Sequence, residues 1–212
     1  MAVNQAGVEI AAAGADGSLW FYWAYYGTST WHAEQVAGPG VVSAGDAPAI
    51  TDSGGATQIA ATTPDGGLDF WWAEHGTPTW YYELVAGPLA VTSAPAMAWN
   101  EAGVEITAAG PDGSLLFYWA YNGTSTWHPE QVAGPGAAAA APAILEIGGY
   151  VWIAATQLDG ETNLYIAGHG SPTWHRAQFI YGPACHPVPP AITLVTNSRY
   201  GTFAELAQTY GC

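Results

Sequence analysis

Basic residues are almost missing from this chain of 212 residues, which contains no lysine and only two arginines, Arg176 and Arg199. Its 17 acidic residues give a formal net charge of −15. Nucleic acids and anionic membranes are bound through clustered Lys and Arg, so no nucleic acid is expected as a partner and the charge argues against anionic membranes. Charged residues make up only 9% of the chain, against about 25% in typical domains. The surface is therefore rich in neutral polar and aromatic side chains, which suit neutral, hydroxyl-rich ligands; a GC-rich source genome or an acidic habitat is the alternative explanation.

Long apolar runs are also missing. No stretch approaches the roughly 18 apolar residues that a membrane-spanning helix needs, so no membrane insertion is expected. The opening segment MAVNQAGVEI has neither the basic region nor the apolar core of a signal peptide, so we predict none in this chain.

Cysteine is limited to Cys185 and Cys212, both near the C-terminus. Two cysteines without other metal-type spacing suggest one disulfide that fastens the C-terminal segment, with two free thiols as the alternative. A disulfide implies an oxidising compartment, so we expect an extracellular or surface-exposed protein, either secreted or on a virion.

What the chain has instead is a fourfold repeat. Asp-Gly occurs at 16–17, 65–66, 112–113 and 159–160, in steps of 49, 47 and 47 residues. A Gly-Thr/Ser-x-Thr-Trp motif follows each pair and keeps the same register, with GTSTWH at 27–32 and again at 123–128. The first and third repeats are nearly identical, which suggests that a two-repeat unit was itself duplicated. Such periods are typical of repeat architectures.

Each repeat predicts four β-strands. In the third repeat, short apolar or aromatic runs at 94–100, 104–110, 115–121 and 127–134 are separated by turn residues such as Asp-Gly and Asn-Gly. A four-stranded antiparallel unit of 40–50 residues that repeats along the chain is a propeller blade.

The predicted fold is therefore all-β, a β-propeller of four-stranded antiparallel blades in a single domain, 1–212. We expect four full repeats of ~47 residues and a partial C-terminal repeat that closes the ring against the N-terminal blade. An alternative is that the extra strands pair with a second chain, which gives a homo-oligomer. The predicted boundaries are 1–47, 48–94, 95–141 and 142–189 for the blades and 190–212 for the closing segment.

The order of Ala-Pro-Ala, Asp-Gly, an aromatic strand and the Gly/Trp turn resembles the blades of β-propeller lectins, most of all the tachylectin-type and the fungal and bacterial fucose-type propellers. This resemblance implies sugar sites between neighbouring blades. Fucose-type sites commonly use an arginine in each pocket, whereas no arginine repeats here.

The repeated tryptophan and the residues after it are the candidate ligand-binding groups. An indole ring matches the apolar face of a pyranose, and neighbouring polar groups supply hydrogen bonds. A structural role for the same tryptophan, as a packing residue of every blade, is the alternative. The candidates are Trp31, His32, Glu34, Trp80, Tyr81, Glu83, Trp127, His128, Glu130, Trp174 and His175.

Catalysis is not expected, because glycoside hydrolysis needs two carboxylates facing one cleft and the acidic residues here recur with the blades. No cofactor or metal site is predicted either. The expected function is that of a multivalent lectin for neutral mono- or oligosaccharides. The alternative is a non-catalytic protein-interaction module or a structural module of a virion or cell surface.

Overall fold

The computed structural model describes residues 1–180, 188–197 and 201–207, and in these ranges it contains strands and no helix. The all-β prediction is thus confirmed. The described residues contain no helix that is long and apolar enough to cross a membrane. Cys185 and Cys212 lie outside the described residues, so the disulfide stays a prediction.

Four sheets of four antiparallel strands follow one another along the chain, one sheet for each sequence repeat. Each sheet is a simple meander in which sequential strands pair. The strands are, in the first blade, β1 (Ala2–Val3), β2 (Gly7–Ala13), β3 (Leu19–Tyr25) and β4 (His32–Ala37); in the second, β5 (Ala49–Asp52), β6 (Ala56–Thr62), β7 (Leu68–Glu74) and β8 (Tyr81–Ala86); in the third, β9 (Ala96–Trp99), β10 (Gly103–Ala109), β11 (Leu115–Tyr121) and β12 (His128–Ala133); in the fourth, β13 (Ala143–Ile147), β14 (Tyr150–Thr156), β15 (Thr162–Gly168) and β16 (His175–Ile180).

The Asp-Gly pairs form the hairpin between the second and third strands of each blade, as predicted. In the first blade, Gly17 has a φ of 78°, which a side chain would strain, and the Asp16 carboxylate accepts the backbone N–H of Ser18 at 3.1 Å. These turns set the register of the two central strands, in which Gly7 pairs with Tyr25 and Ala13 with Leu19.

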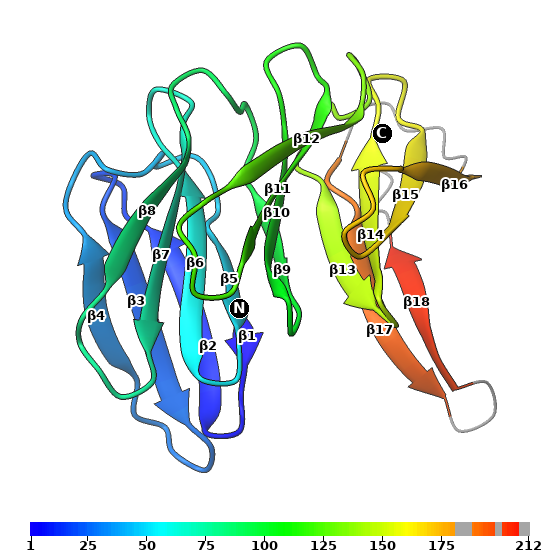
Figure 1. Ribbon diagram of the computed structural model, residues 1–212. Helices are drawn as coiled ribbons and strands as arrows, with labels where there is room; N and C mark the ends of the chain where they lie inside the picture. The colour runs from blue at the N-terminus through cyan, green and yellow to red at the C-terminus, as the bar shows by residue number, and fades with distance from the viewer. Residues whose placement is uncertain (181–187, 198–200, 208–212) are drawn as a thin grey trace.

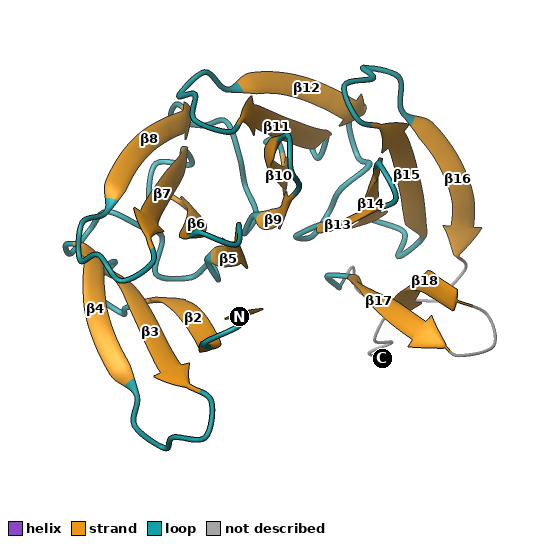
Figure 2. Ribbon diagram, turned by 60° about the horizontal axis from the view of Figure 1, so that its bottom comes forward, coloured by secondary structure: helices purple, strands orange, loops and turns teal. Residues whose placement is uncertain are grey.

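The blades are arranged as a propeller. The first strand of each blade lies innermost and the fourth outermost, as Figure 2 shows. Neighbouring inner strands contact one another in the order β1, β5, β9 and β13. The propeller prediction is confirmed by this arrangement.

A fifth, two-stranded sheet follows, formed by β17 (Ala191–Asn197) and β18 (Gly201–Ala207). β17 contacts β13 and so takes the place of the inner strand of a further blade (Figure 1). The predicted closure against the N-terminal blade is not seen: β17 and β18 pair only with each other among the described strands, and the two ends of the arc stand apart in Figure 2. Four blades and half of a fifth turn through less than a full circle.

Packing between blades forms the core. The cluster between the second and third blades illustrates it: Phe70 of β7 packs against Val104 and Ile106 of β10 and Tyr118 of β11, all buried. Equivalent clusters join the first blade to the second and the third to the fourth. Because both faces of an inner blade are covered, its central strands are apolar on both faces, as their sequences indicate.

The motif tryptophan is part of this packing. In each of the three interfaces between full blades, its indole lies edge-on against a phenylalanine of the preceding blade. The ring centroids are 5.3 Å apart for Trp80 and Phe21, 5.2 Å for Trp127 and Phe70, and 5.1 Å for Trp174 and Phe117. Trp31 has no blade before it and is 51% exposed.

A glutamate on the outer strand connects these indoles across the interface. The Glu130 carboxylate accepts hydrogen bonds from Trp119 Nε1 of its own blade at 2.8 Å and from Trp174 Nε1 of the next blade at 3.2 Å. Glu83 accepts from Trp72 and Trp127 in the same way, at 3.3 and 3.0 Å. A carboxylate that accepts from two half-buried indoles therefore ties each of these blades to the next.

Glu130→Gln should lower the free energy of unfolding by about 2 kcal/mol, because a carboxamide offers one oxygen where two indole N–H groups need acceptors. Urea denaturation of the whole chain measures this. Glu34→Gln is the matched control, since Trp80 Nε1 has no partner and the Glu34 side chain makes no hydrogen bond in the described part of the chain. Equal effects of the two substitutions would show that the bridge contributes nothing.

Candidate functional site

Two clefts open between blades, one between the first and second blades (the 1–2 cleft) and one between the third and fourth (the 3–4 cleft). Their empty volumes, which include space open to solvent, are about 1270 Å³ for the 1–2 cleft and about 510 Å³ for the 3–4 cleft. They are built from equivalent positions of the two-repeat unit. The 3–4 cleft is lined by, among others, Asn100, Glu105, Trp119, Tyr121, His169 and Trp174.

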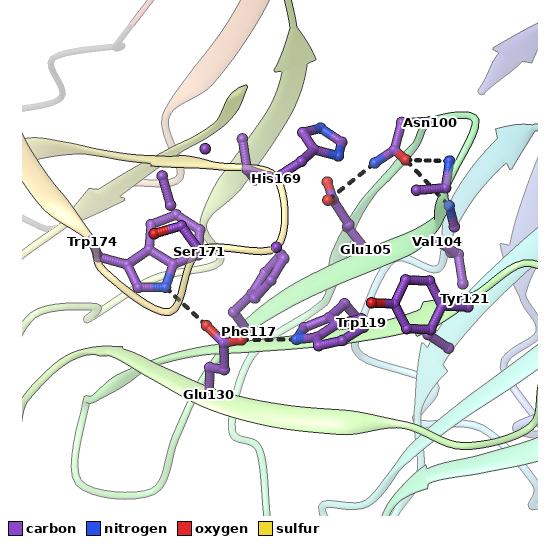
Figure 3. A pocket seen from close by; sticks show the side chains of 17 residues that line it. Asn100, Val104, Glu105, Phe117, Trp119, Tyr121, Glu130, His169, Ser171 and Trp174 are labelled. Carbon is purple, nitrogen blue, oxygen red and sulfur yellow. Dashed lines mark hydrogen bonds between the residues drawn. The ribbon is translucent and has the colours of Figure 1, made fainter. Parts of the chain in front are cut away.

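Aromatic rings form one wall of the 3–4 cleft. Trp119 and Tyr121, two residues apart on β11, point to the same face of the strand, and their rings meet at 82° with centroids 5.0 Å apart (Figure 3). His128 of β12 stacks on Trp119 at 4.2 Å. The hydrogen bond to Glu130 holds the Trp119 indole in its plane. The ring is therefore preorganised, with the neighbouring strand fixing its orientation.

The floor of this cleft is a buried carboxylate on β10. Glu105 is 6% exposed, and its Oε1 accepts a hydrogen bond from Asn100 Nδ2 at 3.1 Å. Burial raises the pKa of Glu105 to about 7; the charge of Glu146 acts in the same direction, and His169 and Asn100 oppose it. The group is therefore a poorly solvated acid at neutral pH.

The fourth blade supplies the opposite side of the floor. Glu146 lies on β13 and His169 directly follows β15, and a ligand-type atom of each comes within 4.8 Å of one from Glu105. His169 Nε2 lies 2.6 Å from Glu146 Oε2. Ser171 lies in the turn after it and also lines the cleft (Figure 3).

The 1–2 cleft repeats this arrangement with Glu9 as its buried acid. Burial again raises the pKa of Glu9. Asn4 Nδ2 donates to it at 2.8 Å, and His75 Nε2 lies 2.7 Å from Asp52 Oδ2. One difference is that Thr57 Oγ1 also donates to Glu9, at 3.1 Å, whereas the position of Thr57 is taken by Val151 in the fourth blade.

The interface between the second and third blades departs from this pattern. The register places Gln58 where the first and third blades have their buried glutamate. Trp99 and Asn122 stand where the second and fourth blades have an acid and a histidine. Trp99 Nε1 donates to Asn122 Oδ1 at 3.3 Å. The same backbone geometry therefore carries a different set of side chains, and the acidic floor occurs at alternate interfaces.

Glycine is required where the backbone passes the cleft. A Cβ on Gly103, at the start of β10, would collide with the carbonyl oxygen of Ala120 on β11, and Gly7 has the same relation to Ala24. Both glycines lie on cleft-lining segments. The close approach of the two strands thus depends on the absence of a side chain.

The residues proposed from sequence fall into three groups. Trp80, Trp174, Glu34 and Glu130 line the clefts, and all of them except Glu34 also make contacts between blades. Another group stacks on the third-strand indoles or takes part in the indole–carboxylate bonds: His32, Tyr81, His128, Glu83 and Trp127. Trp31 and His175 are exposed and line neither cleft.

Sequence reasoning did not select the floor of the clefts. Glu9 and Glu105 recur in the first and third repeats, and His75 and His169 recur in the second and fourth. A search at the period of two repeats would have found both pairs. An acidic residue inside an otherwise apolar strand is a further signal, because such a group needs a partner when it is buried.

No family model matches the chain, and no curated protein matches it in sequence. Among solved structures it is similar to the BP39L lectin from Burkholderia pseudomallei, with 16% identity and a TM-score of 0.77 over 97% of this chain and 66% of that one. It is also similar to the SapL1 lectin in complex with alpha methyl fucoside, with 13% identity and a TM-score of 0.68 over 96% and 73% of the two chains. A Trypanosoma rangeli sialidase has 11% identity and a TM-score of 0.62 over 92% and 40%.

The chain thus spans slightly less than two thirds of BP39L. At these identities the likeness is one of fold, and the same fold occurs in an enzyme. The expected resemblance is confirmed at that level: this chain is a β-propeller that resembles the propellers of lectins.

Proposed function

We propose that the chain is a non-catalytic carbohydrate-binding protein whose sites are the 1–2 and 3–4 clefts. The observation that carries the proposal is the pairing, twice in the chain, of an aromatic wall with a buried polar floor in an open inter-blade cleft. The likeness to lectin propellers such as BP39L and SapL1 supports it.

The chemistry of the cleft suits a sugar ring. Trp119 and Tyr121 offer apolar surface to the C–H face of a pyranose. The Glu105 carboxylate, the Asn100 amide and the His169 imidazole lie on the other side of the cleft and can pair with hydroxyl groups (Figure 3). A ligand that fits both sides is amphipathic across its ring, as a monosaccharide is.

The proposed ligands are neutral saccharides. Two acidic side chains, Glu105 and Glu130, line the 3–4 cleft, and no arginine lines it. With a net charge of −15, the chain repels sialic acids and other anionic sugars. SapL1 was solved with alpha methyl fucoside, so methyl α-fucoside belongs among the first ligands to test, together with neutral hexoses.

Binding without catalysis is proposed because the carboxylates are not placed as an acid and a nucleophile. Glu130 accepts from two indoles, so both of its oxygens are engaged. Glycoside hydrolysis needs two carboxylates that are free to face the scissile bond. The two clefts on one rigid arc instead favour multivalent binding, in which linked weak sites gain avidity. A secreted or virion-surface location, where glycans are accessible, is part of the same proposal.

Trp119→Ala should weaken sugar binding at the 3–4 cleft by at least about tenfold, because it removes the apolar wall. Isothermal titration with methyl glycosides measures the affinity. Trp72→Ala is the matched control: Trp72 makes the same indole–carboxylate bond, to Glu83, but belongs to the interface without an acidic floor. If Trp72→Ala weakened binding as much as Trp119→Ala, the effect would come from blade packing and not from a site.

The native chain should bind two equivalents of a monosaccharide, one in each cleft. Trp23→Ala, which alters the equivalent wall of the 1–2 cleft, and Trp119→Ala should each leave one equivalent, and the double variant should leave none. Titration to saturation gives the stoichiometry. Failure of the native chain to bind across a broad glycan array would exclude the proposal.

A further inference from the structure

Each cleft floor contains two carboxylates and one imidazole contributed by two different blades. The first set, the Glu105 triad, consists of Glu105, Glu146 and His169; one ligand-type atom from each side chain lies within 4.8 Å of the other two. The second set, the Glu9 triad, consists of Glu9, Asp52 and His75, with the same spacing. Glu105 and His169 can pair with sugar hydroxyl groups, but that role requires no second acid beside them, and one is present in both floors.

The Glu105 triad contains a buried oxygen without a partner. Glu105 is 6% exposed, and its Oε2 accepts no hydrogen bond. Asn100 occupies the other oxygen, and the nearby His169 lies against Glu146. A buried carboxylate oxygen without a donor is costly, so the folded chain has a place here for a positively charged partner.

In the Glu9 triad, the protein itself supplies a hydrogen-bond donor to each oxygen of the buried carboxylate. There, Asn4 donates to one oxygen of Glu9 and the Thr57 hydroxyl donates to the other. Val151, the counterpart of Thr57, has no hydroxyl. With valine in place of threonine, Glu105 Oε2 therefore lacks the hydroxyl donor that the equivalent oxygen of Glu9 has.

We propose that Glu105, Glu146 and His169 form a binding site for a divalent transition-metal ion, with Zn²⁺ as the best-fitting ion. Carboxylate oxygen and imidazole nitrogen are zinc ligands, whereas Ca²⁺ and Mg²⁺ prefer oxygen ligands alone. Three protein ligands leave a fourth tetrahedral position, which would face the cleft.

The geometry needs only small side-chain movements. Ligand atoms about 2.0–2.2 Å from a tetrahedral ion lie roughly 3.3–3.6 Å from one another. His169 Nε2 and Glu146 Oε2, now 2.6 Å apart, would separate to admit the ion, and Glu105 Oε2 would approach it. Asn100 Nδ2 and the backbone N–H of Gly149 already orient the two carboxylates from behind, at 3.1 and 3.2 Å. Because Glu105 belongs to the third blade and the other two ligands to the fourth, the ion would tie these blades together.

The test is titration of ZnCl₂ into the full, untagged chain after treatment with a chelator, in the absence of sugar. The native chain should bind one equivalent more tightly than any other. Glu105→Gln should weaken that equivalent at least tenfold, because a carboxamide is a poor zinc ligand of nearly the same shape. Val151→Thr should weaken it as well, since the new hydroxyl would occupy Glu105 Oε2 as Thr57 occupies Glu9.

Glu9→Gln is the matched control and should leave the tightest equivalent unchanged. Circular dichroism checks that each variant is folded, and zinc should raise the Tm of the native chain but not that of Glu105→Gln. No zinc binding by the native chain, or binding that survives Glu105→Gln at native affinity, would overturn the proposal. Since no sugar is present, this result is independent of whether the clefts bind carbohydrate.

Discussion

The fold depends on how one blade is attached to the next, because neither face of a propeller blade is stable in water alone. An apolar interface can slide, whereas the Glu83 and Glu130 carboxylates each accept from an indole on their own blade and from another on the next. This directional contact fixes how the second blade sits against the third and the third against the fourth. It also holds the third-strand indole, Trp119 in the third blade, in a fixed orientation beside the cleft, so the stability of the arc and the shape of the site have the same origin.

Each proposed site is built from two blades, although each sheet is formed by one sequence repeat. All four blades share hairpins and inner strands, and the Trp–Phe contact recurs at each of the three interfaces between them. The acidic floor requires a glutamate from an odd blade and an acid and a histidine from the even blade that follows, so it occurs at the first and third interfaces. At the second interface, Gln58, Trp99 and Asn122 occupy the corresponding positions. The near identity of the first and third repeats in sequence is the trace of this two-blade period.

The buried carboxylates at the base of the two clefts need hydrogen-bond donors, and the protein supplies these donors to different degrees. Both carboxylate oxygens of Glu9 accept a hydrogen bond, one from Asn4 and one from Thr57, whereas Glu105 accepts only the hydrogen bond from Asn100. Burying a carboxylate costs free energy that apolar packing elsewhere must offset. Groups retained at such a cost are typical of binding sites, and here both lie at the base of an open cleft, beside aromatic rings.

The sequence by itself determined the blades. Asp-Gly turns, aromatic strands and a constant period are local signals, and they identified four-stranded units, their order and the absence of helices in the described chain. Only the tertiary structure decided which side chains share a cleft, because Glu105 and His169 lie 64 positions apart and meet only when two blades pack. The same is true of Trp127, which bonds to Glu83 of the preceding blade and not to its near neighbour Glu130. Local sequence patterns likewise could not predict whether the ring closes, because closure depends on the angle between each pair of packed blades.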